Sequence, residues 1–242
     1  MRLQLMSWPE VQRYLEGSNG VIVPIGATEQ HGPIGLIGTD AICAETLSWK
    51  AGELCGALVG PTLTVGMSEH HMHFPGSITL RPTTLAAVVR DVVLSLARHG
   101  FRRVLFVNGH GGNTVPAKAA ASDLLARRED VEWIWRSWWE HPAVKALEDT
   151  FFGDRNGDHA TAAEISMTMH LFPGAVAPID RLTVEHPDHE WPLGPRRFRE
   201  TFPDGRIGSD PSLADADKGK RLFELCVEIY GTELDDLLAR QA

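Results

Sequence analysis

The chain has 242 residues, of which 43% are hydrophobic and 23% are charged, and its formal net charge is -9. This composition is ordinary for a folded globular protein and excludes a disordered chain. The negative charge and the scattered basic residues argue against a nucleic-acid partner, because phosphate binding needs a basic face. The length fits one α/β domain over residues 1–242 or two small domains, and we favour the single domain.

The cysteines are Cys43, Cys55 and Cys226, odd in number and far apart, which predicts reduced thiols. The first residues lack an apolar region followed by a small-residue cleavage site, and no stretch approaches the ~20 apolar residues of a membrane span. We therefore expect a cytoplasmic protein without a membrane partner.

Apolar, β-rich runs alternate with helical patterns along the chain. Helices are expected at residues 7–17, 40–55, 82–98, 114–128 and 210–238, and strands at 21–25, 57–60, 103–107 and 133–135. A loop with short helical pieces follows, then a helix that begins at 157–160, and a long loop or lid at 173–207. The strands show no polar alternation, which is typical of strands buried on both faces. We predict an α/β fold with a mainly parallel sheet covered by helices on both sides.

The loop after the first strand carries three side chains suited to binding metal. Glu29 and His31 flank one residue, so a locally extended backbone points both the same way, and Asp40 follows nine residues after His31. Carboxylate oxygens combined with imidazole nitrogen suit Zn, Mn or Fe, whereas Ca and Mg prefer oxygen alone. The alternative is a helix-capping Glu29 and a surface His31, but a buried glutamate would need a cation to offset its desolvation.

The strand at 103–107 runs into the turn Asn-Gly-His-Gly-Gly-Asn at residues 108–113. A strand, a Gly-rich loop and a helix are also the parts of a dinucleotide site, so a nucleotide-binding module is an alternative. However, His110 occupies a place where bare backbone should approach the pyrophosphate, and the next strand ends in Arg136 and Ser137 instead of a ribose-binding acid. We therefore predict that His110 is a metal ligand.

A third polar group lies at the expected helix start near residue 158. Asp158 and His159 precede Glu164 in a segment built otherwise of Ala, Thr and Ser. We expect Glu164 to reach a metal and His159 to move a proton, the alternative being a capping aspartate beside an exposed histidine. Of the three histidines in the loop at 62–81, we expect His71 at the substrate and the others at the surface.

Together these motifs resemble those of the creatininase (creatinine amidohydrolase) family over nearly the whole chain. The matching stretches are E-Q-H-G at 29–32, T-D at 39–40, S-x-x-H-x-x-F-P-G-S at 68–77, N-G-H-G-G-N at 108–113 and H-A-x-x-x-E-I-S at 159–166. The resemblance implies a three-layer α/β/α sandwich, a homohexamer, and two divalent metal ions per subunit bridged by an aspartate.

The resemblance also implies roles for single residues. Asp40 would bridge the two ions, with Glu29 and His110 on one of them and His31 on the other. His159 matches the catalytic histidine of the family.

The chain departs from creatininase itself at two positions. The glutamate ligand two residues after the turn histidine is replaced by Gly112, and we expect Glu164 to take its place, as in members with an HGGN turn. A tryptophan shortly before the catalytic histidine is replaced by Arg155, so creatinine is not the expected substrate.

The expected activity is that of a metal-dependent amidohydrolase acting on non-peptide C–N bonds of a small molecule. A metal-bridged hydroxide would attack the carbonyl of a cyclic amide or formamide, which Ser68 or the second ion would polarise. His159, oriented by Asp158, would protonate the leaving amine. Trp138 and Trp139 would wall the pocket, although packing of the sheet edge explains them equally well.

Two other functions remain open from the sequence. The same chemistry serves a cyclic ketone or lactone, such as an oxidised cyclitol, which makes a hydrolase of that class the second candidate. A structural metal protein without turnover is the third, and it would have no use for His159.

Overall fold

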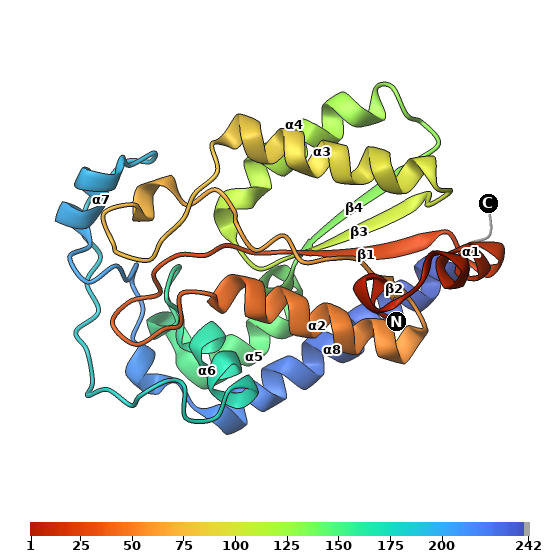
Figure 1. Ribbon diagram of the computed structural model, residues 1–242. Coiled ribbons are helices and arrows are strands. Elements are labelled where there is room, and N and C mark those ends of the chain that lie inside the picture. Colours follow the sequence, from red (N-terminus) through yellow and green to blue (C-terminus); the bar gives the residue numbers. More distant parts are fainter. Residues whose placement is uncertain (240–242) are drawn as a thin grey trace.

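A four-stranded parallel sheet forms the centre of the fold (Figure 1). The computed structural model describes the backbone of residues 1–239 and the side chains of residues 1–235. The strands are β1 (Gly20–Ile25), β2 (Leu58–Val59), β3 (Arg103–Asn108) and β4 (Glu132–Ser137), in the order β2-β1-β3-β4. All three pairings are parallel, which confirms the predicted sheet.

Helices cover both faces of this sheet (Figure 1). One face carries α1 (Trp8–Gly17), α3 (Pro82–Arg98) and α4 (Thr114–Leu125). The other carries α2 (Thr39–Cys55), α5 (Pro142–Phe152), α6 (Ala162–Leu171) and α8 (Ala216–Ala239). The predicted α/β/α layers are therefore confirmed. None of the helices in the described part of the chain is both long and apolar enough to span a membrane.

The strand side chains alternate between two hydrophobic cores. Ile22 and Leu105 point into the core shared with α2, α5, α6 and α8, whereas Val21 and Val104 point into the core shared with α3. Every residue of β1 and β3 is buried, as expected for strands covered on both faces. The two cores hold the ends of these strands in place, and with them the loops that carry the candidate ligands.

Several element boundaries differ from the predicted ones. Residues 142–152 form the single helix α5, which His141 caps by accepting a hydrogen bond from the amide of Ala143. The helix expected to begin at 157–160 begins at Ala162, because Thr161 and Glu164 form a capping box.

The remaining differences concern the ends of elements and the long loop. α4 ends at Leu125, β2 has only two residues, and α8 begins at Ala216 instead of residue 210. The segment predicted as a loop or lid contains the short helix α7 (Pro195–Thr201), which lies beyond the end of the sheet in Figure 1.

Candidate metal centre

The loops that follow β1 and β3 meet at one edge of the sheet. Parallel pairing places Ile25 opposite Asn108, so the residues after both strands emerge side by side. The side chain of Asn108 accepts a hydrogen bond from the amide of His110 and donates one to its carbonyl. This turn holds His110 beside the loop that carries Glu29 and His31.

The first turn of α2 approaches this edge so closely that only glycine fits beneath it. A Cβ added to Gly109 would overlap the backbone carbonyl of Asp40, and one added to Gly26 would overlap the backbone amide of Ala41. The two glycines therefore bring Asp40 directly over the strand ends.

Replacing Gly109 with alanine is expected to destabilise the protein by about 1–3 kcal/mol, because α2 must move away from the sheet to admit the methyl group. Urea unfolding measures this change. Gly111→Ala is the matched control, since a Cβ there would meet nothing within 4 Å. Equal losses of stability in the two variants would contradict the close approach of α2.

Asp40 lies between two histidines and contacts each through a different oxygen. Its Oδ1 is 2.9 Å from His31 Nε2, and its Oδ2 is 3.3 Å from His110 Nδ1. Glu29 Oε1 is 3.3 Å from the same nitrogen of His110, and Glu164 Oε2 is 3.8 Å from His31 Nε2. Of the three groups of possible ligand atoms in the described residues, two share Asp40, namely Glu29–Asp40–His110 and His31–Asp40–Glu164.

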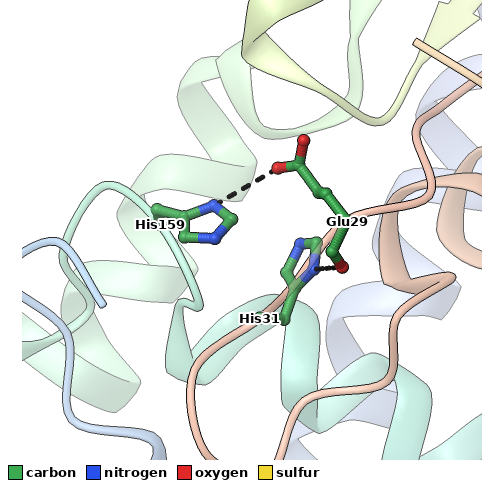
Figure 2. A group of neighbouring side chains, drawn as sticks. All are labelled: Glu29, His31 and His159. Atoms are coloured by element: carbon green, nitrogen blue, oxygen red, sulfur yellow. Dashed lines mark hydrogen bonds and ion pairs between the residues drawn. The ribbon is translucent and has the colours of Figure 1, made fainter. Parts of the chain in front are cut away.

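Backbone carbonyls fix the orientation of both imidazoles. His31 Nδ1 lies 3.1 Å from the carbonyl oxygen of Glu29 (Figure 2), and His110 Nε2 lies 2.9 Å from that of Met67. Because a carbonyl only accepts, these two nitrogens carry protons. The opposite nitrogens, which face the carboxylates, are left to bind a metal ion or a second proton.

The carboxylates of the cluster are buried without enough hydrogen-bond partners. Both oxygens of Glu29 and Oδ2 of Asp40 accept no hydrogen bond, although the two residues are 0% and 2% exposed. An unpaired buried carboxylate costs several kcal/mol, which a cation offsets. The nitrogen–oxygen distances of 2.9–3.3 Å fit a shell with metal–ligand bonds of about 2.1 Å. The residues present therefore fit divalent metal ions.

Charges within the cluster shift its pKa values strongly. Burial alone would raise the pKa of Glu29, but His110 and His71 hold it well below its usual value. Burial would lower the pKa of His31, but the charges of Asp40, Glu164 and Glu29 and the hydrogen bond to Asp40 together outweigh it and raise that pKa to about 10. The carboxylates thus favour positive charge at the centre of the site, which a divalent ion supplies.

His159 approaches the carboxylate of Glu29 from a distant part of the chain (Figure 2). Its Nδ1 lies 3.7 Å from Glu29 Oε1, and its Nε2 lies 2.8 Å from the carbonyl oxygen of Gln30. Burial and the charges of His71 and His31 hold the pKa of His159 well below its usual value. The ring is therefore neutral, with Nε2 donating to Gln30 and the lone pair of Nδ1 facing the site.

The predicted orientation of His159 by Asp158 is wrong. Asp158 is exposed, and among the described residues its carboxylate makes no hydrogen bond to His159. The backbone of His159 forms an antiparallel bridge with Ile207, and Ser209 Oγ donates to its carbonyl oxygen. These contacts, together with Gln30, orient the histidine.

Gln30 connects several parts of the site, although the sequence pattern assigned it no role. Its Nε2 donates to His71 Nδ1 at 2.8 Å and to the carbonyl oxygen of Gly205 at 2.9 Å, and its backbone carbonyl accepts from His159 Nε2. His71 in turn places Nε2 3.2 Å from Glu29 Oε1 and stacks on His159 at 4.4 Å. No local signal could reveal these contacts, because the partners of Gln30 are 41 to 175 residues away in the sequence.

The other two histidines of the 62–81 loop differ in exposure. His73 is exposed, as predicted. His70 is not: it is partly buried, with its ring 4.0 Å from that of His71 and 5.0 Å from that of Phe198. The surface position predicted for His70 is therefore wrong.

A cavity of about 320 Å³ opens beside the candidate ligands. Its lining includes Asp40, His110, His159, Glu164, Trp138, Trp139, Lys145, Glu148 and Asp158. Trp138 also packs in the hydrophobic core. It therefore both lines the pocket and contributes to packing, the two roles considered for the tryptophan pair. Ser68 and His71, which the sequence predicts at the substrate, are buried but do not line this cavity, and the hydroxyl of Ser68 has no hydrogen-bond partner.

Glu148 is a cavity residue that the sequence pattern did not single out. It is 7% exposed, and its carboxyl has no hydrogen bond or ion pair within the described residues. It stands one helical turn after Val144 and one turn before Phe152, both buried in α5. A carboxylate inside an apolar i, i+4 row of a helix is the signal that identifies such a residue.

Glu148 is expected to make the stability of the protein depend on pH. Burial, together with the charge of Glu164, raises its pKa from 4.5 to about 8, and Lys145 acts weakly against this. The folded state thus holds a proton that the unfolded state releases, so the contribution to stability is fully present below the unfolded pKa and is lost as pH rises through the folded pKa.

The free energy of unfolding of Glu148→Gln, relative to that of the wild type, should therefore increase as the pH rises from about 5 to about 8.5. At the higher pH the variant should be more stable by a few kcal/mol. Urea unfolding at both pH values measures the margin. Asp149→Asn removes an exposed carboxylate from the same helix and should show no such growth. A margin for Glu148→Gln that is the same at both pH values would contradict the burial of an ionisable carboxyl.

Three known enzymes illustrate the relationships of the chain. Creatinine amidohydrolase of Pseudomonas putida is 30% identical over 92% of each chain. The mycofactocin precursor peptide peptidase of Mycobacterium ulcerans is 30% identical over 86% of this chain and 81% of its own. The 3-dehydro-scyllo-inosose hydrolase of Thermotoga maritima is 24% identical over 70% of this chain and 56% of its own.

Solved structures agree with these relationships. A manganese form of creatininase has a TM-score of 0.86 and 26% identity, covering 99% of both chains. A variant creatininase of Zn-Zn type has a TM-score of 0.84 and 26% identity, covering 99% of this chain and 98% of its own. The creatinine amidohydrolase family model matches residues 4–232. The chain belongs to the creatininase (creatinine amidohydrolase) family.

Proposed function

We propose that the protein uses two divalent metal ions to hydrolyse a non-peptide amide bond in a small molecule. Membership of a family of hydrolases supports the reaction class. The observation that carries the proposal is Asp40, whose two oxygens face two separate groups of ligand atoms. Ligand sets of carboxylates and imidazoles suit Zn, Mn or Fe.

Each ion would have its own ligands. Glu29 and His110 would hold one ion, His31 and Glu164 the other, and Asp40 both. Glu164 as the replacement ligand is supported by Gly112, because a Cβ at Gly112 would overlap the ring of His110 and the backbone of the preceding loop. No side chain fits there, whereas Glu164 lies on the His31 side of the cluster.

When bound, such a pair of ions supplies an acidified water and a Lewis acid for the substrate carbonyl. His159 is placed to move the proton, because Gln30 occupies its Nε2 and leaves Nδ1 facing the site. It would take a proton from the attacking water and give it to the leaving nitrogen. Gln30 would keep the ring in this orientation through its backbone carbonyl.

The cavity suits a small substrate with a flat face. A volume of about 320 Å³ accommodates a compact molecule, and Trp138 and Trp139 offer an aromatic wall to a ring. We propose a cyclic amide or a formamide. An oxidised cyclitol or a lactone is the second candidate, because the chain resembles a 3-dehydro-scyllo-inosose hydrolase.

A nucleotide phosphate would fit this site poorly. His110, in the turn that resembles a phosphate-binding loop, contacts the carboxylates of Glu29 and Asp40. The turn thus directs an imidazole into the ligand cluster instead of presenting bare backbone amides to a phosphate.

Metal analysis and a substrate screen test the proposal. Protein purified without added ions, or reloaded with Zn, Mn or Fe after chelation, should contain about two ions per chain. The loaded protein should hydrolyse at least one formamide or cyclic amide, and the chelated protein none. A chain that is metal-free and cannot be loaded would contradict the metal pair, and hydrolysis of lactones alone would favour the second candidate.

A further inference from the structure

Glu148 lines the cavity of the candidate site but takes no part in the ligand cluster. It comes from α5, and it belongs to none of the groups of possible metal ligands found in the described residues. The residue is 7% exposed, and its carboxyl has no hydrogen-bond or ion-pair partner among the described residues. The carboxyl groups of buried residues are usually paired. The described part of the protein supplies no partner for this one, so a ligand in the cavity can pair with it.

The charges around the cavity indicate which partner would fit. Besides Glu148, Asp158 lines the same cavity and is not one of the proposed metal ligands, so its carboxylate would disfavour an anionic ligand. Lys145, three residues before Glu148 on α5, is exposed and makes no ion pair with it. Burial, with a smaller contribution from the charge of Glu164, raises the pKa of Glu148 to about 8, so its surroundings stabilise the ionised form poorly. A cation that enters the cavity would stabilise it.

The aromatic wall favours the same kind of ligand. Trp138 and Trp139 line the cavity together with Glu148. A carboxylate near tryptophan rings is a common way to bind a positively charged nitrogen, because an ion pair and cation–π attraction act together.

We propose that Glu148 determines substrate specificity by binding a positively charged nitrogen group of the substrate, such as an ammonium, amidinium or guanidinium. The inference rests on the proposed function, since it names the substrate class of the same cavity. The substrate would place its carbonyl at the candidate metal centre and its cationic nitrogen against α5.

Three formamides that differ only at their far end test this inference. N-formylethylenediamine carries an ammonium, N-(2-hydroxyethyl)formamide a neutral hydroxyl and N-formylglycine a carboxylate. Isothermal titration calorimetry on the metal-loaded protein should show that the ammonium probe binds about tenfold more tightly, or better, than the hydroxyl probe. Glu148→Gln keeps the shape of the side chain and should abolish this preference. Asp149→Asn, an exposed carboxylate on the same helix, should retain it.

Several outcomes would overturn the inference. They are equal binding of the ammonium and hydroxyl probes, tightest binding of the carboxylate probe, absence of binding by all three, and a preference that survives Glu148→Gln. Hydrolysis measured on the same samples separates this inference from the proposed function. A preference that Glu148→Gln abolishes, without any hydrolysis, supports Glu148 and contradicts the hydrolase. Hydrolysis without a preference supports the hydrolase and contradicts the role of Glu148.

Discussion

Replacing Asp40 with asparagine is expected to remove both metal ions and abolish hydrolysis. The two carboxylate oxygens face different histidines, so an amide leaves at least one group of ligands without its oxygen and removes the shared negative charge. Loss of a residue that only supports a ligand lowers metal affinity about 10–100-fold, and loss of a shared ligand should exceed this, reaching about 10³-fold. Metal content and competition titration with a chelating dye measure the loss.

The control for this prediction is Asp91→Asn. Asp91 lies on α3, where it makes a surface ion pair with Arg90 at 3.7 Å, so the variant carries the same change of charge away from the site. It should bind metal like the wild type. Circular dichroism shows whether the Asp40 variant remains folded. A folded Asp40→Asn protein that binds two ions as tightly as the wild type would rule out the bridging role.

Replacing His159 with glutamine should lower kcat by about 10²–10⁴-fold and leave the metal content unchanged, because only proton transfer is lost. Nδ1 of His159 faces Glu29 from 3.7 Å, and Nε2 is occupied by Gln30. Steady-state kinetics and metal analysis of the same preparation measure the two quantities separately.

The metal content also decides between two roles for this histidine. Glu29, His31 and His159 together form another possible ligand group. If His159→Gln loses one ion per chain, the histidine is a ligand and the predicted role is wrong. Full activity with a full metal content would contradict both roles. His73→Gln, which replaces an exposed histidine of the neighbouring loop, should change neither quantity.

The segment at 173–207 supports the candidate site from outside it. Phe198 of α7 lies edge-on to His71 at 4.8 Å, Gly205 accepts a hydrogen bond from Gln30, and Ile207 pairs with the backbone of His159. The predicted long loop therefore has a structural role, because it holds the side chains that contact Glu29.

Much of the fold could be predicted from the sequence because the relevant signals are local. An unbroken apolar run such as residues 21–25 marks a strand buried on both faces, and strands that alternate with helices favour parallel pairing because the helix supplies the crossover connection. The ends of parallel strands meet at one edge, so the loop with Glu29, His31 and Asp40 was expected to lie near His110. The structure brings these four residues together.

What only the tertiary structure decided depends on contacts between distant segments. The sequence places Asp158 next to His159, but His159 is extended in a bridge with Ile207, and neighbours in an extended backbone point to opposite sides. Gln30 therefore orients the histidine where Asp158 was expected to. The sequence did not identify Glu148 as a site residue for a related reason. The apolar residues one turn before and after it mark a buried helix face, but only the tertiary packing shows that this face borders a cavity. Local patterns determine which residues carry the chemistry, whereas packing determines which of them face one another.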